Sequence, residues 1–186
     1  MRSGVRVLGV MAAMLVAAPA HADEGEQHFS LGPMLSFLRV DRKTTIDFGA
    51  GAMARYSYRL TDQIDLTGSA SWAIVAADQQ QDTPQTPTNR PAIVGDATIG
   101  ASWVLDLLKR WNPWGGIEGG VYWLSGGTLP AARVSPGGSV AIGLDFFLTP
   151  HLAIGVEGRQ HFLLAYMDEY PSYTTGLLRF TLALGR

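Results

Sequence analysis

The sequence of 186 residues contains no cysteine at all. This absence excludes disulfide frameworks, thiolate zinc sites and cysteine nucleophiles. Charge is scarce as well, since Asp, Glu, Lys and Arg make up only 16% of the chain and the formal net charge is -2. Nucleic-acid binding depends on a concentrated basic surface, so we expect no nucleic-acid partner.

Hydrophobic residues, by contrast, make up 47% of the chain, which also contains 22 glycines, 10 prolines and 10% aromatic residues. Gly and Pro disfavour helices, whereas aromatic residues favour strands. After the N-terminus, no stretch approaches the 18 consecutive apolar residues of a membrane-spanning helix. The composition therefore predicts an all-β protein.

The N-terminus has the order of a secretory signal. Arg2 and Arg6 precede an apolar run that ends at Ala18, and small residues follow at once. The run is shorter than the roughly 20 residues that a membrane helix requires. We predict a signal peptide over residues 1–20, cleaved after Ala20 or Ala22, and a single domain over residues 23–186.

Apolar and polar residues alternate with a period of two through most of the remaining chain. Between Ile46 and Leu60 the even positions are apolar, and the odd positions are mostly polar or small. Such alternation is typical of strands with two different faces. The predicted strands are Phe29–Val40, Ile46–Leu60, Ile64–Ala77, Ala92–Leu105, Trp114–Leu124, Ser139–Leu148, Leu152–Leu164 and Ser172–Leu184.

The connections between these strands alternate in character. Asp41–Lys43, Asp78–Arg90, Ser125–Gly138 and Tyr166–Pro171 form one set, and Thr61–Gln63, Asp106–Pro113 and Thr149–His151 form the other. An antiparallel up-and-down sheet of eight strands with this alternation places both chain ends on the side of the second set.

Ionisable side chains within the strands share the face opposite the apolar one. A soluble barrel would need its polar face outside, whereas a membrane barrel needs polar residues inside and apolar residues toward lipid. We therefore predict an eight-stranded antiparallel transmembrane β-barrel. The predicted interior residues are Asp47, Arg55, Arg59, Asp65, Asp96, Glu118, Asp145, Glu157, Arg159, His161 and Arg179.

Aromatic residues gather toward the two ends of the predicted strands. Amphipathic rings favour the headgroup level of a membrane, so we expect two belts at the lipid interface. The predicted belt residues are Tyr56, Tyr58, Trp72, Trp103, Trp114, Trp123, Phe162 and Phe180.

The segments Tyr58–Leu66 and Phe147–Glu157 resemble the strand, short turn, strand units of small eight-stranded outer-membrane barrels, the group of the opacity proteins, the OmpA membrane domain and OmpW-like proteins. The resemblance covers nearly all of the mature chain. It implies an outer-membrane location, contact with membrane lipid and lipopolysaccharide, and insertion by the barrel-assembly machinery. Members usually end in an aromatic residue, whereas this chain ends Leu182-Ala183-Leu184-Gly185-Arg186.

Eight strands enclose a space that side chains nearly fill, which argues against a wide channel. The predicted role is structural or surface recognition, with a narrow conduit for small solutes as a possible addition. No pair of histidines in the mature chain has metal-ligand spacing, and we expect no cofactor. For recognition of an extracellular ligand, the aromatic and acidic segment around the last long connection is the candidate: Tyr166, Asp168, Glu169, Tyr170 and Tyr173. An aromatic belt at the membrane surface is the alternative for the same tyrosines, and it is the one that the sequence favours.

Two other functions stay open at this point. A barrel enzyme that modifies lipid A would need a histidine with a carboxylate and a serine, and Glu157 and His161 share one face. Candidate serines are Ser125, Ser135, Ser139 and Ser172. A soluble secreted β-barrel that binds an apolar ligand is the third hypothesis.

Overall fold

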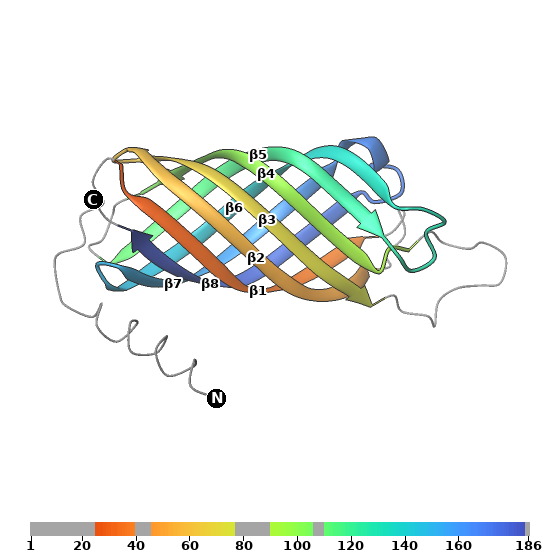
Figure 1. Cartoon of the computed structure of the whole chain (residues 1–186), viewed down its shortest axis with the longest axis horizontal. Helices are drawn as coiled ribbons and strands as arrows, with labels where there is room; N and C mark the ends of the chain where they lie inside the picture. The colour runs from red at the N-terminus through yellow and green to blue at the C-terminus, as the bar shows by residue number, and fades with distance from the viewer. Residues whose placement is uncertain (1–24, 40–45, 77–89, 106–109, 185–186) are drawn as a thin grey trace, which may run out of the picture.

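The computed structural model describes residues 25–39, 46–76, 90–105 and 110–184. Eight antiparallel strands form one closed barrel, in which each strand pairs with the next and β8 pairs with β1 (Figure 1). The predicted all-β, up-and-down barrel is thus confirmed. The strands are β1 (Gln27–Arg39), β2 (Ile46–Thr61), β3 (Ile64–Ala76), β4 (Ile93–Val104), β5 (Trp111–Ser125), β6 (Arg133–Thr149), β7 (Leu152–Leu163) and β8 (Ser172–Leu184), with a 3₁₀ turn, η2 (Leu164–Tyr166), after β7.

Some predictions concern residues outside the described ranges. These are the signal peptide over residues 1–20 with its cleavage after Ala20 or Ala22, the connection Asp41–Lys43, residues 78–89 of the long polar connection, and residues 106–109 of the connection Asp106–Pro113.

The predicted strand bounds agree with the structure to within about three residues, except at the start of β6. This strand begins at Arg133, six residues before the predicted Ser139. Gly137 and Gly138 suggested a loop, yet both pair with β5 and β7. Gly137 has a packing role, because the ring of Tyr122 occupies the space where a Cβ would project. A strand glycine that receives a cross-strand aromatic ring is therefore not a loop signal.

Two tight turns with threonine at the first position join strands at one end of the barrel. In the β2–β3 turn the Thr61 hydroxyl accepts a hydrogen bond from the Ile64 amide at 3.1 Å. In the β6–β7 turn the Thr149 hydroxyl accepts one from the His151 amide at 3.3 Å. Such side-chain to backbone bonds are typical of polar turn residues. β1 starts and β8 finishes at this end, which we call the terminal end; the opposite end is the loop end (Figure 1).

The outer surface of the barrel is apolar. Large hydrophobic side chains project outward from every strand, and Ile99, Ile117 and Ile142 are 75%, 68% and 68% exposed. Inside, charged and hydroxyl side chains alternate with them along each strand. A soluble barrel has a polar outer face in contact with water. The hypothesis of a soluble secreted β-barrel therefore requires the opposite arrangement of the two faces from the one observed. Among the described residues, no helix has the length and apolar character needed to cross a membrane.

Candidate functional site: the barrel interior and its loop-end mouth

Six charged side chains from five strands meet in the middle of the barrel, and we call them the central ion network: Arg55, Glu118, Asp145, Glu157, Arg159 and Arg179. Arg159 is its hub. Its guanidinium donates to Glu118 Oε2 at 2.7 Å and to Glu157 Oε1 at 2.7 Å. Three arginines face three carboxylates, so the network has no net formal charge.

The two glutamates are held from several sides. Glu118 accepts hydrogen bonds from the hydroxyls of Thr67, Ser69 and Thr98 at 3.1, 2.7 and 2.6 Å. Glu157 also receives Arg179 Nη1 at 3.3 Å. Buried charges are tolerated when ion pairs and hydrogen bonds replace water in this way. The network fills the centre of the barrel with fixed charges, each of which lies beside at least one opposite charge.

The other charged groups inside the barrel have their partners on the two sides of this network, toward the terminal end and toward the loop end. Arg59 donates to Asp65 near the terminal end. Ser71 donates to Asp96, and Asp47 lies 3.8 Å from Arg90 near the loop end. All eleven predicted interior residues are buried, with at most 9% of any of them exposed.

Trp114 corrects the predicted aromatic belt. It was expected at the lipid interface, but its side chain points into the barrel and is only 6% exposed. There the guanidinium carbons of Arg55 and Arg179 lie 4.3 and 4.5 Å from the centroid of its indole ring. The inward position of Trp114 could have been predicted from the sequence, because Trp114 and Glu118 are four residues apart and therefore share a face of β5.

The other predicted belt residues face outward. Tyr56, Tyr58, Trp103 and Phe180 project near the terminal end, and Trp72 and Phe162 near the loop end, each at least 37% exposed. Trp123 is partly covered because its indole lies across Gly95 on the neighbouring strand. This cross-strand packing leaves no room for a larger residue than glycine at position 95.

The loop-end mouth is closed by an apolar cluster. Its buried members, which come from six strands and the β7–β8 connection, are Leu38, Val75, Val94, Tyr122, Leu124, Leu163, Tyr170 and Tyr173, and Leu129 and Tyr166 pack against them. Leu129 belongs to the β5–β6 connection and Tyr170 to the β7–β8 connection. The buried Arg90, which precedes β4, points to Asp47 at the same end.

This closure corrects the predicted recognition segment. Tyr170 and Tyr173 are buried at 1% and 0% exposure, so neither ring is presented to a partner. Their rings pack among the other side chains of the apolar cluster, because protein interiors are closely packed. Glu169 pairs with Arg133, whose guanidinium also lies 5.2 Å from the Tyr166 ring. Of the five predicted residues, Asp168 is exposed, and Tyr166 and Glu169 are partly exposed.

The groups of the lipid A enzyme hypothesis have other partners. The His161 ring nitrogens lie 3.2 Å from the Tyr122 hydroxyl and 3.1 Å from the Thr175 hydroxyl. Glu157 contacts Arg159, Arg179 and Arg55. In the part of the chain that the structure describes, no group of three His, Asp or Glu residues is arranged to hold a metal ion.

The comparisons with known proteins give structural matches only. No protein-family model matches the chain, and no curated protein matches its sequence. The attachment invasion locus protein Ail of Yersinia pestis has a TM-score of 0.58 at 17% identity, over 87% of this chain and 99% of that one. OprG of Pseudomonas aeruginosa has a TM-score of 0.57 at 13% identity, over 91% of this chain and 100% of that one.

Neisserial surface protein A also matches, with a TM-score of 0.56 at 14% identity, over 88% of this chain and 100% of that one. A second structure of Ail contains the heparin analogue sucrose octasulfate. At these identities the likeness concerns architecture. The chain has the fold of the small eight-stranded outer-membrane barrels, the group that its strand, short turn, strand units resemble.

Proposed function

We propose that this protein is a closed barrel of the outer membrane that acts at the cell surface through its loop end. The apolar exterior fits a lipid environment, and the fold is that of solved outer-membrane barrels. The predicted signal peptide supports export, and cleavage after Ala20 or Ala22 is part of the proposal. In this orientation the terminal end faces the periplasm.

The observation that carries the proposal is the closed interior. A solute entering from the loop end would first meet the apolar cluster around Tyr170 and Leu124. It would then meet the central ion network, in which Arg159 joins Glu118 to Glu157. Passage would require breaking both, and buried ion pairs are costly to break. The function is therefore expected at the surface, in structural support of the membrane or in recognition.

The ligand of Ail does not transfer readily to this chain. Sucrose octasulfate carries many negative charges, and a site for it needs an excess of cations. Among the described residues near the loop end, Arg39, Arg90 and Arg133 are balanced by Asp47, Asp168 and Glu169. We therefore propose that any extracellular partner is recognised without a strongly cationic surface.

Epitope insertion tests the orientation. A tag inserted after Ala131, in the exposed β5–β6 connection, should bind antibody on intact cells. The matched control is the same tag after Asp62 in the β2–β3 turn, which should bind only after permeabilisation. Labelling of both tags, or of the Asp62 tag alone, on intact cells would contradict the proposed orientation.

Conductance tests the closed interior. The purified protein, refolded into planar bilayers, should give no stepwise conductance in simple salt solutions. Heat-modifiable gel migration of the same sample shows that the barrel is folded. A stable and reproducible channel formed by the folded wild-type protein would overturn the proposal.

A further inference from the structure

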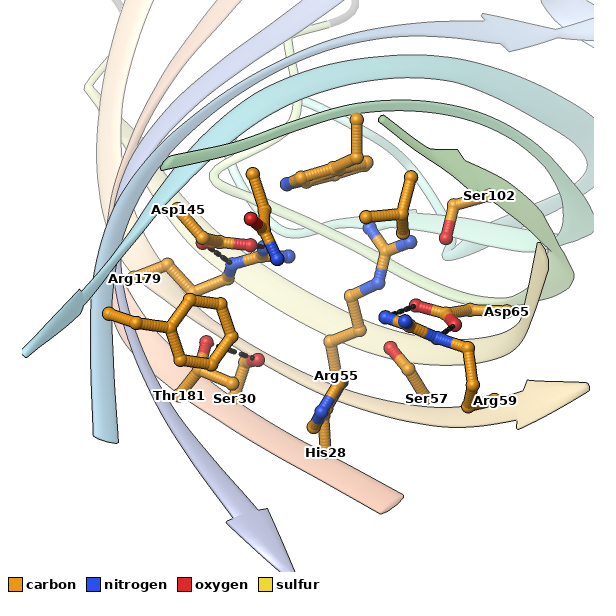
Figure 2. A pocket seen from close by; sticks show the side chains of 14 residues that line it. His28, Ser30, Arg55, Ser57, Arg59, Asp65, Ser102, Asp145, Arg179 and Thr181 are labelled. Carbon is orange, nitrogen blue, oxygen red and sulfur yellow. Dashed lines mark hydrogen bonds and ion pairs between the residues drawn. The ribbon is translucent and has the colours of Figure 1, made fainter. Parts of the chain in front are cut away.

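A small cavity lies inside the barrel between the central ion network and the terminal end. Its volume is about 30 Å³, which suffices for one small particle because a single water needs only about 10–15 Å³. Arg55 rises through it, with the Asp145–Arg179 pair on one side and the Arg59–Asp65 pair on the other (Figure 2). The Trp114 indole also belongs to its wall.

The wall of this cavity has unused hydrogen-bond donors. Arg55 Nε, Arg55 Nη1 and Trp114 Nε1 are buried and have no hydrogen-bond partner. All three nitrogens can only donate. His28 Nε2 is a fourth buried nitrogen of the wall without a hydrogen bond, and it lies 3.3 Å from Glu26 Oε2.

The carboxylates of the wall are already engaged. Asp145 accepts from Arg179, and Asp65 accepts from Arg59. Within the described residues, no carboxylate oxygen of this wall is left without a hydrogen-bond partner. Arg55 does face Glu118 and Glu157, but both ion pairs are 3.6 Å long, beyond the usual 2.7–3.2 Å of an N–H···O hydrogen bond. The buried side-chain atoms of this wall that have no hydrogen-bond partner are therefore all nitrogens, and three of them can only donate.

Cations outnumber carboxylates in the wall itself, and Glu118 and Glu157 of the central ion network balance the charge behind it. Three arginines, Arg55, Arg59 and Arg179, line the cavity against two aspartates. A water molecule could accept from only two of the free donors. A monatomic anion accepts from every direction and donates nothing. Buried donors cost free energy when they stay unpaired, so the occupant that satisfies most of them is preferred.

We propose that this cavity is a binding site for one chloride-sized monovalent anion, held by Arg55 and Trp114. The anion serves as the hydrogen-bond acceptor for the free donors of Arg55 and Trp114, and it enters from the terminal end, past Arg59 and His28. This inference is independent of the proposed surface function, since an anion could occupy a closed barrel or a conducting one.

Bromide provides the test, because it replaces chloride and quenches indole fluorescence by contact. Titration of the folded barrel in detergent at constant ionic strength should show a saturable quenching phase. Chloride should relieve this phase by competition, whereas sulfate, which is too large for the cavity, should not. Trp114→Phe should abolish the saturable phase, and the matched control Trp111→Phe, on the outward face, should keep it.

A crystal structure of the barrel grown in bromide gives a direct answer. The expected result is an anomalous peak within hydrogen-bond distance of Arg55 and Trp114. A cavity that contains only ordered water under these conditions would refute the site. Quenching that is linear in bromide and unchanged by Trp114→Phe would refute it as well.

Discussion

Replacement of Arg159 by methionine is the most informative test of the interior. Arg159 is fully buried and joins Glu118 to Glu157, so its removal leaves two buried carboxylates with one partner fewer each. Breaking a buried ion pair from one side typically costs about 3–5 kcal/mol. Glu118 retains three hydroxyl donors and Glu157 retains Arg179, and both still face Arg55 at 3.6 Å, but these contacts do not replace the two 2.7 Å hydrogen bonds from Arg159. We expect the unfolding free energy to fall by about 3–5 kcal/mol.

Arg133→Met is the matched control. Arg133 also pairs with a glutamate, but its side chain and that of Glu169 are 18% and 41% exposed. Pairs exposed to water contribute about 0–1 kcal/mol, and the control should lose no more than that. Urea unfolding in lipid vesicles measures both variants, with heat-modifiable migration as the measure of folded protein and the midpoint shift giving the free energy.

The double variant Arg159→Met/Glu157→Gln separates this mechanism from a general packing defect. If the lost charge pairing is the cause, the two substitutions should be coupled by about 0.5–3 kcal/mol and the double variant should be less damaged than the sum. Equal losses for Arg159→Met and Arg133→Met, or strict additivity in the double variant, would refute the claim that the central ion network stabilises the barrel.

Three further predictions address the exterior, the chemistry and export. Val156→Arg places a charge on the lipid-facing side of β7 and should cost about 2–4 kcal/mol in the same titration, whereas Ala153→Ser on the interior side should be mild; equal effects would mean that the strand faces are misassigned. Mass spectra of lipid A should be identical in cells with and without the protein, and an acyl change that requires His161 would make the enzyme hypothesis correct. Intact mass of the protein from outer-membrane fractions should lack residues 1–20 or 1–22, and recovery of the uncleaved chain without detergent would contradict export to the membrane.

The strand pattern and the facing of the charged residues could be predicted from the sequence because a barrel strand has a strict period of two. The alternation along β7, from Leu152 to Leu163, fixes which side chains face outward and which enter the lumen. The same rule, applied consistently, would have placed Trp114 inside with Glu118. The predicted lipid-interface position of Trp114 was wrong because an aromatic residue near a strand end belongs to the belt only when its side chain is on the outward face.

The identity of the partners inside the barrel was decided only by the tertiary structure. Arg159 and Glu118 are 41 residues apart in the sequence. They meet because the closed barrel and the stagger of its strands place these two side chains, from β7 and β5, at the same depth inside the barrel. The mouth was decided in the same way. Tyr170 and Tyr173 carry a polar hydroxyl and lie in or next to a segment rich in turn residues, which favours exposure. In the structure they are buried, because the strand ends surround an apolar space at the loop end that these side chains help to fill.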